Sequence, residues 1–325
     1  MSENNDWREV LGLRSPTEER NPRTGSLDQL DSAELVTTII AEDAGVVGAV
    51  EAVAPAIARL VDLAVAAIGS GGRVHYVGSG TSGRLGVLDA VELLPTYGVG
   101  EEMFVAHLAG GDGAMMQAVE GAEDDVDAGV VAMARVAPAD LVVGLTASGR
   151  TPFVGGALAE ARRVGARTAL VATNPYSVLA AEVDVAVLVD TGPEVVTGST
   201  RMKAGTAQKL VLNTFSTATM VRLGRTYSNL MTAVLPTNQK LRARTVRMLV
   251  QATGIDAARC AEVFAEAGDA RAALVSLLAH VPVARARMLL QENPPDPART
   301  QDPGGVRTAV AAAARQPPAD ERITR

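Results

Sequence analysis

Apolar residues recur along most of this chain in two alternating rhythms, one helical and one extended. Between residues 46 and 68 they return every three or four positions, which predicts one amphipathic helix. Short continuous apolar runs follow, separated mostly by helical stretches, at 73–77, 103–108, 141–145, 168–172 and 185–189. Continuous apolar strands that alternate with helices are typical of a parallel sheet covered on both faces. The pattern therefore predicts an α/β fold with a doubly wound, mostly parallel sheet.

The remaining pattern divides the chain into four parts. Residues 1–32 are polar and are expected to form an N-terminal arm, and 33–240 to hold the sheet with its flanking helices. Residues 241–290 are apolar at helical spacing and predict a small appendage of three helices. Residues 291–325 are rich in Pro and Ala, so we expect a disordered tail. Within the sheet region, further helices are expected around 114–123 and over 206–223.

Composition and charge narrow the class of protein. Hydrophobic residues make up 47% of the chain but aromatic residues only 3%, so the core must consist of small and branched aliphatic side chains. The net charge of -7 offers no basic excess for nucleic acid, and no stretch is typical of a membrane span or a signal peptide. The single cysteine, Cys260, cannot form an internal disulfide. We therefore expect a cytoplasmic protein with no nucleic-acid or membrane partner.

Three loops rich in glycine and hydroxyl side chains, 78–84, 146–152 and 197–203, stand after predicted strands or before a predicted helix. Glycine lets backbone approach a ligand, Ser and Thr donate to phosphate oxygens, and a helix N-terminus favours an anion. One such loop could be an ordinary turn with a helix cap. Three in one sheet favour a sugar-phosphate site, with candidate ligands Ser79, Gly80, Thr81, Ser82, Gly83, Ser148, Gly149, Arg150, Thr151, Ser199, Thr200 and Lys203.

Nucleotide and metal chemistry find little support in these motifs. Residues 78–83 formally satisfy G-x-G-x-x-G, but no acidic residue in the right context follows about 20 positions on, as a dinucleotide site requires. No loop continues into the Gly-Lys-Ser/Thr of a Walker A motif. The three histidines, His75, His107 and His280, have no zinc-ligand spacing, and we expect them to be structural. No cofactor or metal is implied.

Carboxylates are the better candidates for acid–base chemistry. Glu92 stands among apolar neighbours in Val-Glu-Leu-Leu-Pro, where partial desolvation would help it hold a proton, as a general acid must. Glu123 stands in Val-Glu-Gly-Ala-Glu-Asp-Asp, which could equally be a solvated acidic helix end. The residues alone leave both roles open.

Longer runs resemble one enzyme family. They are Thr-Glu-Glu-Arg-Asn-Pro at 17–22, Gly-Thr-Ser-Gly-Arg-Leu-Gly-Val-Leu-Asp-Ala at 80–90, Ala-Val-Glu-Gly-Ala-Glu-Asp at 118–124, Ala-Ser-Gly-Arg-Thr-Pro at 147–152 and Glu-Val-Val-Thr-Gly-Ser-Thr-Arg-Met-Lys at 194–203. Together, from about residue 16 to 278, they resemble the N-acetylmuramic acid 6-phosphate etherases. This family has the sugar-isomerase (SIS) fold, to which glucokinase regulatory protein also belongs.

The resemblance implies a reaction and a set of roles. These etherases cleave the C3 lactyl ether of their substrate by elimination and hydration, giving N-acetylglucosamine 6-phosphate and D-lactate in amino-sugar catabolism and peptidoglycan recycling. Their two acid–base glutamates fall on Glu92, expected to protonate the leaving lactate, and Glu123, expected to take the C2 proton. The fold further implies a homodimer whose sites are completed by the second subunit, and the family needs no cofactor.

Two departures from the family and two other functions stay open. The residues around Glu92 replace the family's usual Ser-Glu-Cys-Pro-Pro, and the Pro/Ala-rich end is expected to lack the family's last helix. The same fold could carry an aldose–ketose sugar-phosphate isomerase, or a sugar-phosphate sensor without catalysis. The presence of both glutamates favours the etherase over the sensor.

Overall fold

The computed structural model describes residues 12, 14–234 and 238–315. They form two compact units. The first contains the chain up to Ala90 and Glu101–Phe215, and the second contains Val91–Gly100 and the chain from Ser216 onward. The boundary expected at residue 240 therefore falls inside the second unit.

A five-stranded parallel sheet forms the centre of the first unit. Its strands are β1 (Val74–Gly78), β2 (Phe104–Leu108), β3 (Leu141–Thr146), β4 (Arg167–Ala172) and β5 (Val185–Leu188). They lie in the order β2-β1-β3-β4-β5, and all neighbours are parallel. Every residue of β1 and β3 is buried, which explains why these strands are continuous apolar runs in the sequence.

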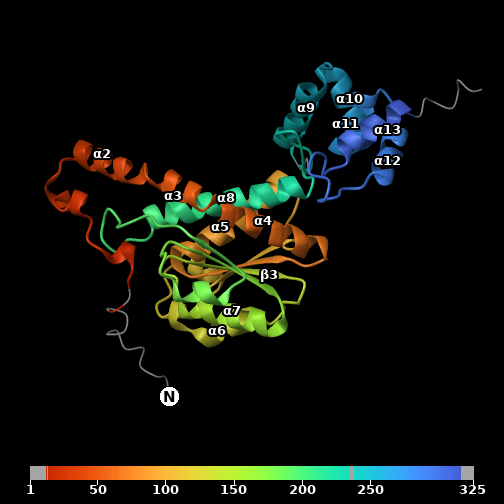
Figure 1. Cartoon of the computed structure of the whole chain (residues 1–325). Coiled ribbons are helices and arrows are strands. Elements are labelled where there is room, and N and C mark those ends of the chain that lie inside the picture. The colour runs from red at the N-terminus through yellow and green to blue at the C-terminus, as the bar shows by residue number, and fades with distance from the viewer. Residues whose placement is uncertain (1–11, 13, 235–237, 316–325) are drawn as a thin grey trace, which may run out of the picture. The chain divides into compact units, whose positions relative to one another are not determined.

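Helices cover both faces of the sheet, so the predicted doubly wound architecture is confirmed (Figure 1). On one face lie α6 (Val126–Ala132) and α7 (Pro152–Val164). On the other face lie α4 (Ala54–Gly69), α5 (Gly80–Tyr97) and α8 (Lys203–Arg222). Neighbouring residues of β1 pack against the helices on opposite faces of the sheet. Val77 packs in a cluster with Phe153 of α7, whereas the ring of Tyr76 lies 6.2 Å from that of Phe215 of α8.

The N-terminal arm contains regular elements before it reaches the sheet. Three 3-10 turns, η1 (Pro16–Glu18), η2 (Pro22–Thr24) and η3 (Leu27–Gln29), precede α2 (Ser32–Asp43) and α3 (Val46–Ala52). A capping box between Asp31 and Glu34 begins α2. Its apolar residues Val36 and Ile40 are 56% and 64% exposed. An apolar helix face is therefore left open to solvent in a single copy.

Two helices of the first unit differ from the prediction. The stretch 46–68 is divided at Val53 between α3 and α4, and the segment Ser32–Ala52 makes a 59° bend with Ala54–Gly69. Pro55 follows two residues later, and its missing N–H prevents α3 from continuing through it. The helix expected around 114–123 is replaced by the 3-10 turns η4 (Asp112–Met115) and η5 (Ala122–Asp124). Gly111 and Gly121 there adopt φ of +73° and +72°, which interrupts a helix.

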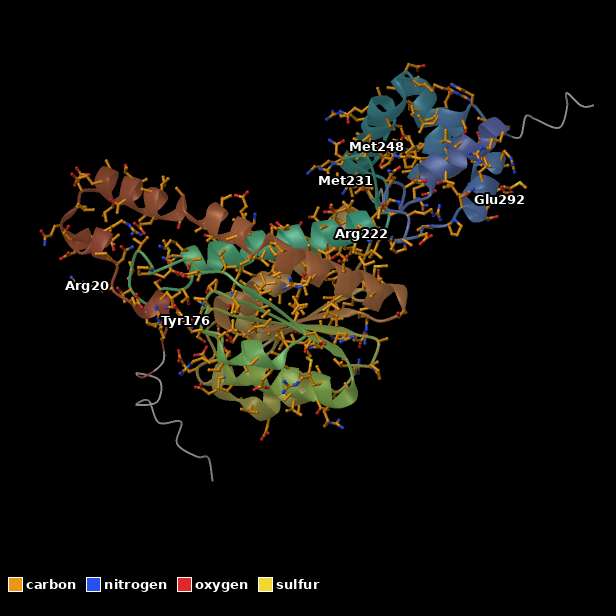
Figure 2. All side chains as sticks on the ribbon, viewed as in Figure 1. Arg20, Tyr176, Arg222, Met231, Met248 and Glu292 are labelled. Atoms are coloured by element: carbon orange, nitrogen blue, oxygen red, sulfur yellow. The ribbon has the colours of Figure 1, made fainter. Side chains whose placement is uncertain are left out.

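The second unit is helical apart from a short hairpin of β6 (Thr226–Tyr227) and β7 (Leu230–Met231). Its helices are α9 (Gln239–Thr253), α10 (Ala257–Ala267), α11 (Ala270–Ala279), α12 (Val283–Glu292) and α13 (Val306–Arg315). Met248 of α9 lies in their shared core (Figure 2). The expectation of a wholly disordered tail without a final helix is wrong, because Val306 and Ala309 of α13 are buried in that core. An alanine-rich run forms helix readily once such a surface is available. Residues 316–325 lie outside the described range.

Among the described residues, no single helix is long and apolar enough to cross a membrane. Two pairs of helices, Ser32–Ala52 with Ala54–Gly69 and Ala270–Ala279 with Val283–Glu292, meet the length and composition together but are sharply bent. A short 3-10 turn, η6 (Val178–Glu182), completes the described elements between β4 and β5.

Candidate active site

The strand order predicts a binding crevice between β1 and β3. From β1 the chain crosses to β2 on one side, and from β3 it proceeds to β4 and β5 on the other. Gly78 at the carboxyl end of β1 pairs with Leu145 near the end of β3. Ligands of open α/β sheets bind where the strand order reverses, beyond the carboxyl ends of the strands. The first two predicted phosphate loops follow these two strands directly.

The first loop, residues 78–83, brings the start of α5 very close to the strand. Gly80 has a φ of +51° and begins the helix. A Cβ on Gly83 would stand only 2.5 Å from the carbonyl oxygen of Gly78, so this position requires glycine. Ser82 is buried beside it, and Ser79 and Thr81 are partly buried. The N-terminus of α5 thus points its backbone donors at the crevice.

The second loop, residues 146–152, is organised by its own hydroxyl groups. The Oγ1 atom of Thr146 lies 2.7 Å from that of Thr151 and 3.4 Å from Oγ of Ser148, and it accepts from the N–H of Gly149. Gly149 has a φ of +75°, and a Cβ there would meet the side chain of Ser177 at 2.3 Å. Helix α7 starts immediately afterwards, without a side-chain cap from Thr151. The loop therefore presents hydroxyls and an uncapped helix N-terminus together.

The third loop, residues 197–203, is built differently from the expectation. The backbone N–H groups of Lys203 and Ala204, which begin α8, both donate to the buried carboxylate of Glu194 at 2.9 Å. Burial raises the pKa of Glu194. Because Glu194 occupies this helix N-terminus, the N–H groups of Lys203 and Ala204 are not available to a bound anion. The loop still adjoins the first one, since Thr81 Cγ2 would stand 3.3 Å from a Cβ on Gly205.

Lys203, a candidate phosphate ligand, already has a partner. Its side chain is 4% exposed, and its Nζ lies 3.2 Å from Oε2 of Glu42. Sequence reasoning missed Glu42 because it lies 161 residues away on α2. No local motif signals that pairing.

Glu123 lies at the mouth of the crevice. It belongs to η5, and the hydroxyl of Ser79 in the first loop donates to its Oε2 at 3.4 Å. Arg84 of α5 holds the segment before η5 in place, because it donates to the backbone carbonyls of Ala114 and Gln117. The structure therefore brings this predicted catalytic carboxylate to a predicted phosphate loop, and it adds Arg84 as a support.

Glu92 lies on α5, twelve residues beyond the start of that helix, and is exposed. Its expected desolvation by apolar neighbours is wrong for a single copy, because Leu88, Val91 and Leu94 are themselves 46%, 58% and 51% exposed. Residues three and four apart share one helix face, so Leu88, Val91 and Glu92 form an open apolar surface with a carboxylate in it. Any desolvation of Glu92 has to come from something that covers this surface.

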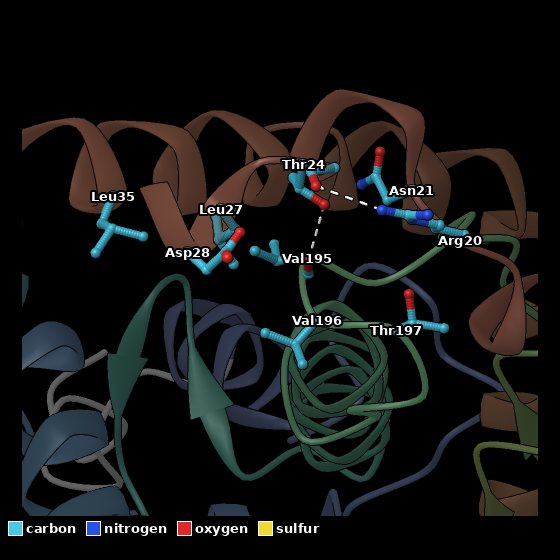
Figure 3. Close-up of a pocket in the computed structure, with 10 residues that line it drawn as sticks. Arg20, Asn21, Thr24, Leu27, Asp28, Leu35, Val195, Val196 and Thr197 are labelled. Atoms are coloured by element: carbon cyan, nitrogen blue, oxygen red, sulfur yellow. Dashed lines mark hydrogen bonds between the residues drawn. The ribbon is translucent and has the colours of Figure 1, made fainter. Parts of the chain in front are cut away.

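Residues 14–25, here called the strap, run along the carboxyl edge of the sheet. Arg14 stacks over the ring of Tyr176 at 4.1 Å, and its carbonyl accepts from Asn174, whose amide also donates to the carbonyl of Ser148. At its other end the hydroxyl of Thr24 donates to the carbonyl of Val195 (Figure 3). The strap lines a pocket of about 440 Å³ together with Leu27, Asp28, Leu35 and residues 195–197, so the pocket reaches the start of the third loop.

Comparison with known proteins agrees with this arrangement. Residues 56–162 match the model of the glucokinase regulatory protein N-terminal SIS domain. The N-acetylmuramic acid 6-phosphate etherase of Thermobifida fusca (strain YX) is 57% identical over 267 residues, which cover 82% of this chain and 88% of that protein. The corresponding etherase of Serratia proteamaculans (strain 568) is 49% identical over 281 residues, 85% of this chain and 94% of its own. That of Cutibacterium acnes (strain DSM 16379 / KPA171202) is 50% identical over 279 residues, with 85% and 92% covered. Since identity at this level extends over most of both chains, this chain belongs to the N-acetylmuramic acid 6-phosphate etherase family.

Proposed function

We propose that this protein cleaves the lactyl ether of N-acetylmuramic acid 6-phosphate to N-acetylglucosamine 6-phosphate and D-lactate, in the recycling or breakdown of cell-wall amino sugars. The observation that carries the proposal is the contact of Glu123 with Ser79, which puts a carboxylate beside a hydroxyl-rich loop at the crevice between β1 and β3. Membership in the etherase family supports the same reaction.

In this proposal the 6-phosphate is held mainly between the first two loops. The N-termini of α5 and α7 direct partial positive charge and backbone donors at it. Hydroxyl and backbone donors would come from Ser79, Gly80, Thr81, Ser82, Gly83, Ser148, Gly149, Arg150 and Thr151. Ser199 and Thr200 of the third loop complete the set, whereas Lys203 acts through its ion pair.

The proposed chemistry needs two carboxyl groups and a water molecule. In the ring-opened sugar the C1 aldehyde acidifies the C2 proton, which Glu123 removes as general base. The C3–O bond then breaks as Glu92 delivers a proton to the lactate oxygen, leaving an unsaturated aldehyde. Water adds its hydroxyl to C3 and a proton returns to C2, which gives the product sugar. No redox step or nucleotide enters this balance, so the proposal invokes no cofactor.

The proposal includes a homodimer, because α5 around Glu92 and α2 both present apolar surfaces that are open in a single copy. Val36 and Ile40 on α2, like Leu88 on α5, are about half exposed or more. Apolar patches on a folded surface commonly mark a protein contact. A second copy over α5 would desolvate Glu92 as a general acid requires. We place this dimer in the cytoplasm, where the buried thiol of Cys260 stays reduced.

The experiment that tests the function is a lactate assay. The purified protein should release D-lactate from N-acetylmuramic acid 6-phosphate and much less from unphosphorylated N-acetylmuramic acid, because the phosphate loops would then be empty. Interconversion of aldose and ketose sugar phosphates without lactate release would instead support an isomerase. Tight binding of the phosphorylated sugar without any turnover would support a sensor.

A further inference from the structure

A buried carboxylate outside the proposed catalytic pair connects three distant segments of the first unit. The side chain of Glu42 is 6% exposed and stands near the end of α2. It accepts hydrogen bonds from Asn21 at 2.8 Å and from the guanidinium of Arg23 at 2.5 and 2.7 Å, both in the strap. Its Oε2 also lies 3.2 Å from the ammonium of Lys203, the first residue of α8.

Further hydrogen bonds from the strap, together with those of Glu42, hold the third loop along its length. Before the loop, Asn21 donates to the carbonyl of Pro193 and Thr24 to that of Val195. Within the loop, the N–H of Gly198 donates to the carbonyl of Thr17 at 3.0 Å. At the end of the loop, Lys203 forms an ion pair with Glu42. The segment that carries Ser199 and Thr200 is thus held at its start, its middle and its end by the strap and Glu42.

We infer that Glu42 is a positioning residue that clamps the strap to the third loop and so sets Ser199 and Thr200 for the substrate phosphate. The inference rests on the proposed function for the identity of the substrate. Glu42 itself touches none of the proposed reacting atoms, so it acts through Asn21, Arg23 and Lys203.

The electrostatics require the carboxylate to stay ionised. Hydrogen bonds from Arg23 lower the pKa of Glu42 to about 2, against the opposing effect of burial. The Lys203 side chain is 4% exposed, and Glu42 is the carboxylate at ion-pair distance from its ammonium among the described residues, while Glu194 also attracts that ammonium through space. Glu42→Gln keeps the size of the side chain but leaves that ammonium buried beside a neutral amide. Lys203 would then lose its ion pair, and the end of the third loop would lose its link to α2 and the strap, although Glu194 still accepts from the first N–H groups of α8.

The measurable consequence is a loss of phosphate affinity with little loss of turnover. A loop that grips the phosphate equally in the ground state and the transition state affects KM rather than kcat. Glu42→Gln should raise KM for N-acetylmuramic acid 6-phosphate by about 10- to 100-fold, with kcat within about threefold of the parent. A merely structural role would lower the active fraction, and hence the apparent kcat, at unchanged KM.

The matched control is Glu160→Gln on α7. Like Glu42, Glu160 accepts two hydrogen bonds from one guanidinium, that of Arg163, but it is not part of the three phosphate loops. It should leave both constants unchanged. The double variant Glu42→Gln/Lys203→Met removes the uncompensated charge and should recover at least part of the lost affinity. Thermal unfolding of every variant checks that it is folded.

The outcomes separate this inference from the proposed function. Titration calorimetry with inorganic phosphate measures the affinity of the loops for phosphate even if the parent protein releases no lactate. Absence of lactate release would reject the proposed function but would not reject the clamp. Weaker phosphate binding by Glu42→Gln, with recovery in the double variant, supports the clamp. Equal KM and phosphate affinity in Glu42→Gln and the parent would overturn it. So would a double variant that binds more weakly than Glu42→Gln, because Lys203 would then be a direct phosphate ligand.

Discussion

Two stacked histidines make the first unit sensitive to acid. The ring centroids of His75 in β1 and His107 in β2 are 5.3 Å apart. Nε2 of His75 lies 3.2 Å from the carboxylate of Asp140, and its Nδ1 lies 3.0 Å from Nε2 of His107. Burial lowers the pKa of both rings, that of His107 to about 4. At neutral pH the uncharged His75 therefore donates to Asp140 and accepts from His107.

The sign and size of the acid effect follow from this shift. An unfolded histidine titrates near 6.5, so the unfolded chain binds a proton on His107 before the folded one does. The contribution of His107 to the free energy of unfolding is therefore fully present above about pH 6.5, and it is lost as the pH falls to about 4. At about 1.4 kcal/mol for each pH unit, the loss amounts to about 3 kcal/mol. That is a large part of the 5–15 kcal/mol that ordinarily separates folded from unfolded protein.

The assay compares urea unfolding at pH 7 and pH 4, followed by far-UV circular dichroism. His107→Gln places an amide donor close to the position of Nε2 but cannot ionise, so it should lose about 3 kcal/mol less stability than the parent between the two values. His280→Asn is the matched control, because His280 is exposed with a φ of +53°, which asparagine tolerates. It should show the full loss of the parent. An equal loss in His107→Gln and the parent would refute the claim that the fold holds this ring neutral.

Three further predictions concern the proposed site and assembly. Glu92→Gln should exchange the C2 proton with deuterated water but release no lactate, whereas Glu123→Gln should lose both, each by about 10²- to 10⁴-fold. NMR beside the lactate assay checks this, and the opposite pattern would reverse the two roles. Ser148→Ala should weaken calorimetric binding of N-acetylglucosamine 6-phosphate by about 1–3 kcal/mol, and an unchanged affinity would remove this hydroxyl from the site. Ile40→Glu should dissociate the proposed dimer in sedimentation, whereas Val131→Glu, a similarly exposed site on α6, should not, and dimers that persist with Ile40→Glu would place the interface elsewhere.

The sheet and two of its loops were predictable because their signals are local. A fully buried strand such as β3 must be apolar throughout, and a loop such as 146–152 needs glycine and hydroxyls within a few residues. The same applies to the end of α7, where Gly165 adopts a φ of +88°, a backbone conformation that favours glycine. These features depend on neighbours in the chain, so the sequence alone carries them.

The parts that escaped prediction depend on contacts between distant residues. Glu42 and Lys203 are separated by 161 positions, and neither stands in a motif that names the other. Apolar neighbours of Glu92 suggested burial, yet apolarity in sequence does not determine what covers a helix face. Helix α13 was missed because its alanines resemble a biased tail until the core around α11 is known.

The charge distribution of the site resolves how a chain of net charge -7 can hold a phosphate. Of the carboxylates beside the third loop, Glu42 and Glu194 are both paired, whereas Glu18 adjoins the loop itself, with its Oε2 2.9 Å from where a Cβ on Gly198 would stand. Glu42 is neutralised by Arg23 and Lys203, and Glu194 by the two N–H groups that begin α8. The N-terminus of α8 is occupied in this way, whereas Thr151 gives α7 no side-chain cap. The phosphate is therefore expected between the first and second loops, and the third loop contributes hydroxyls whose position depends on the Glu42 clamp.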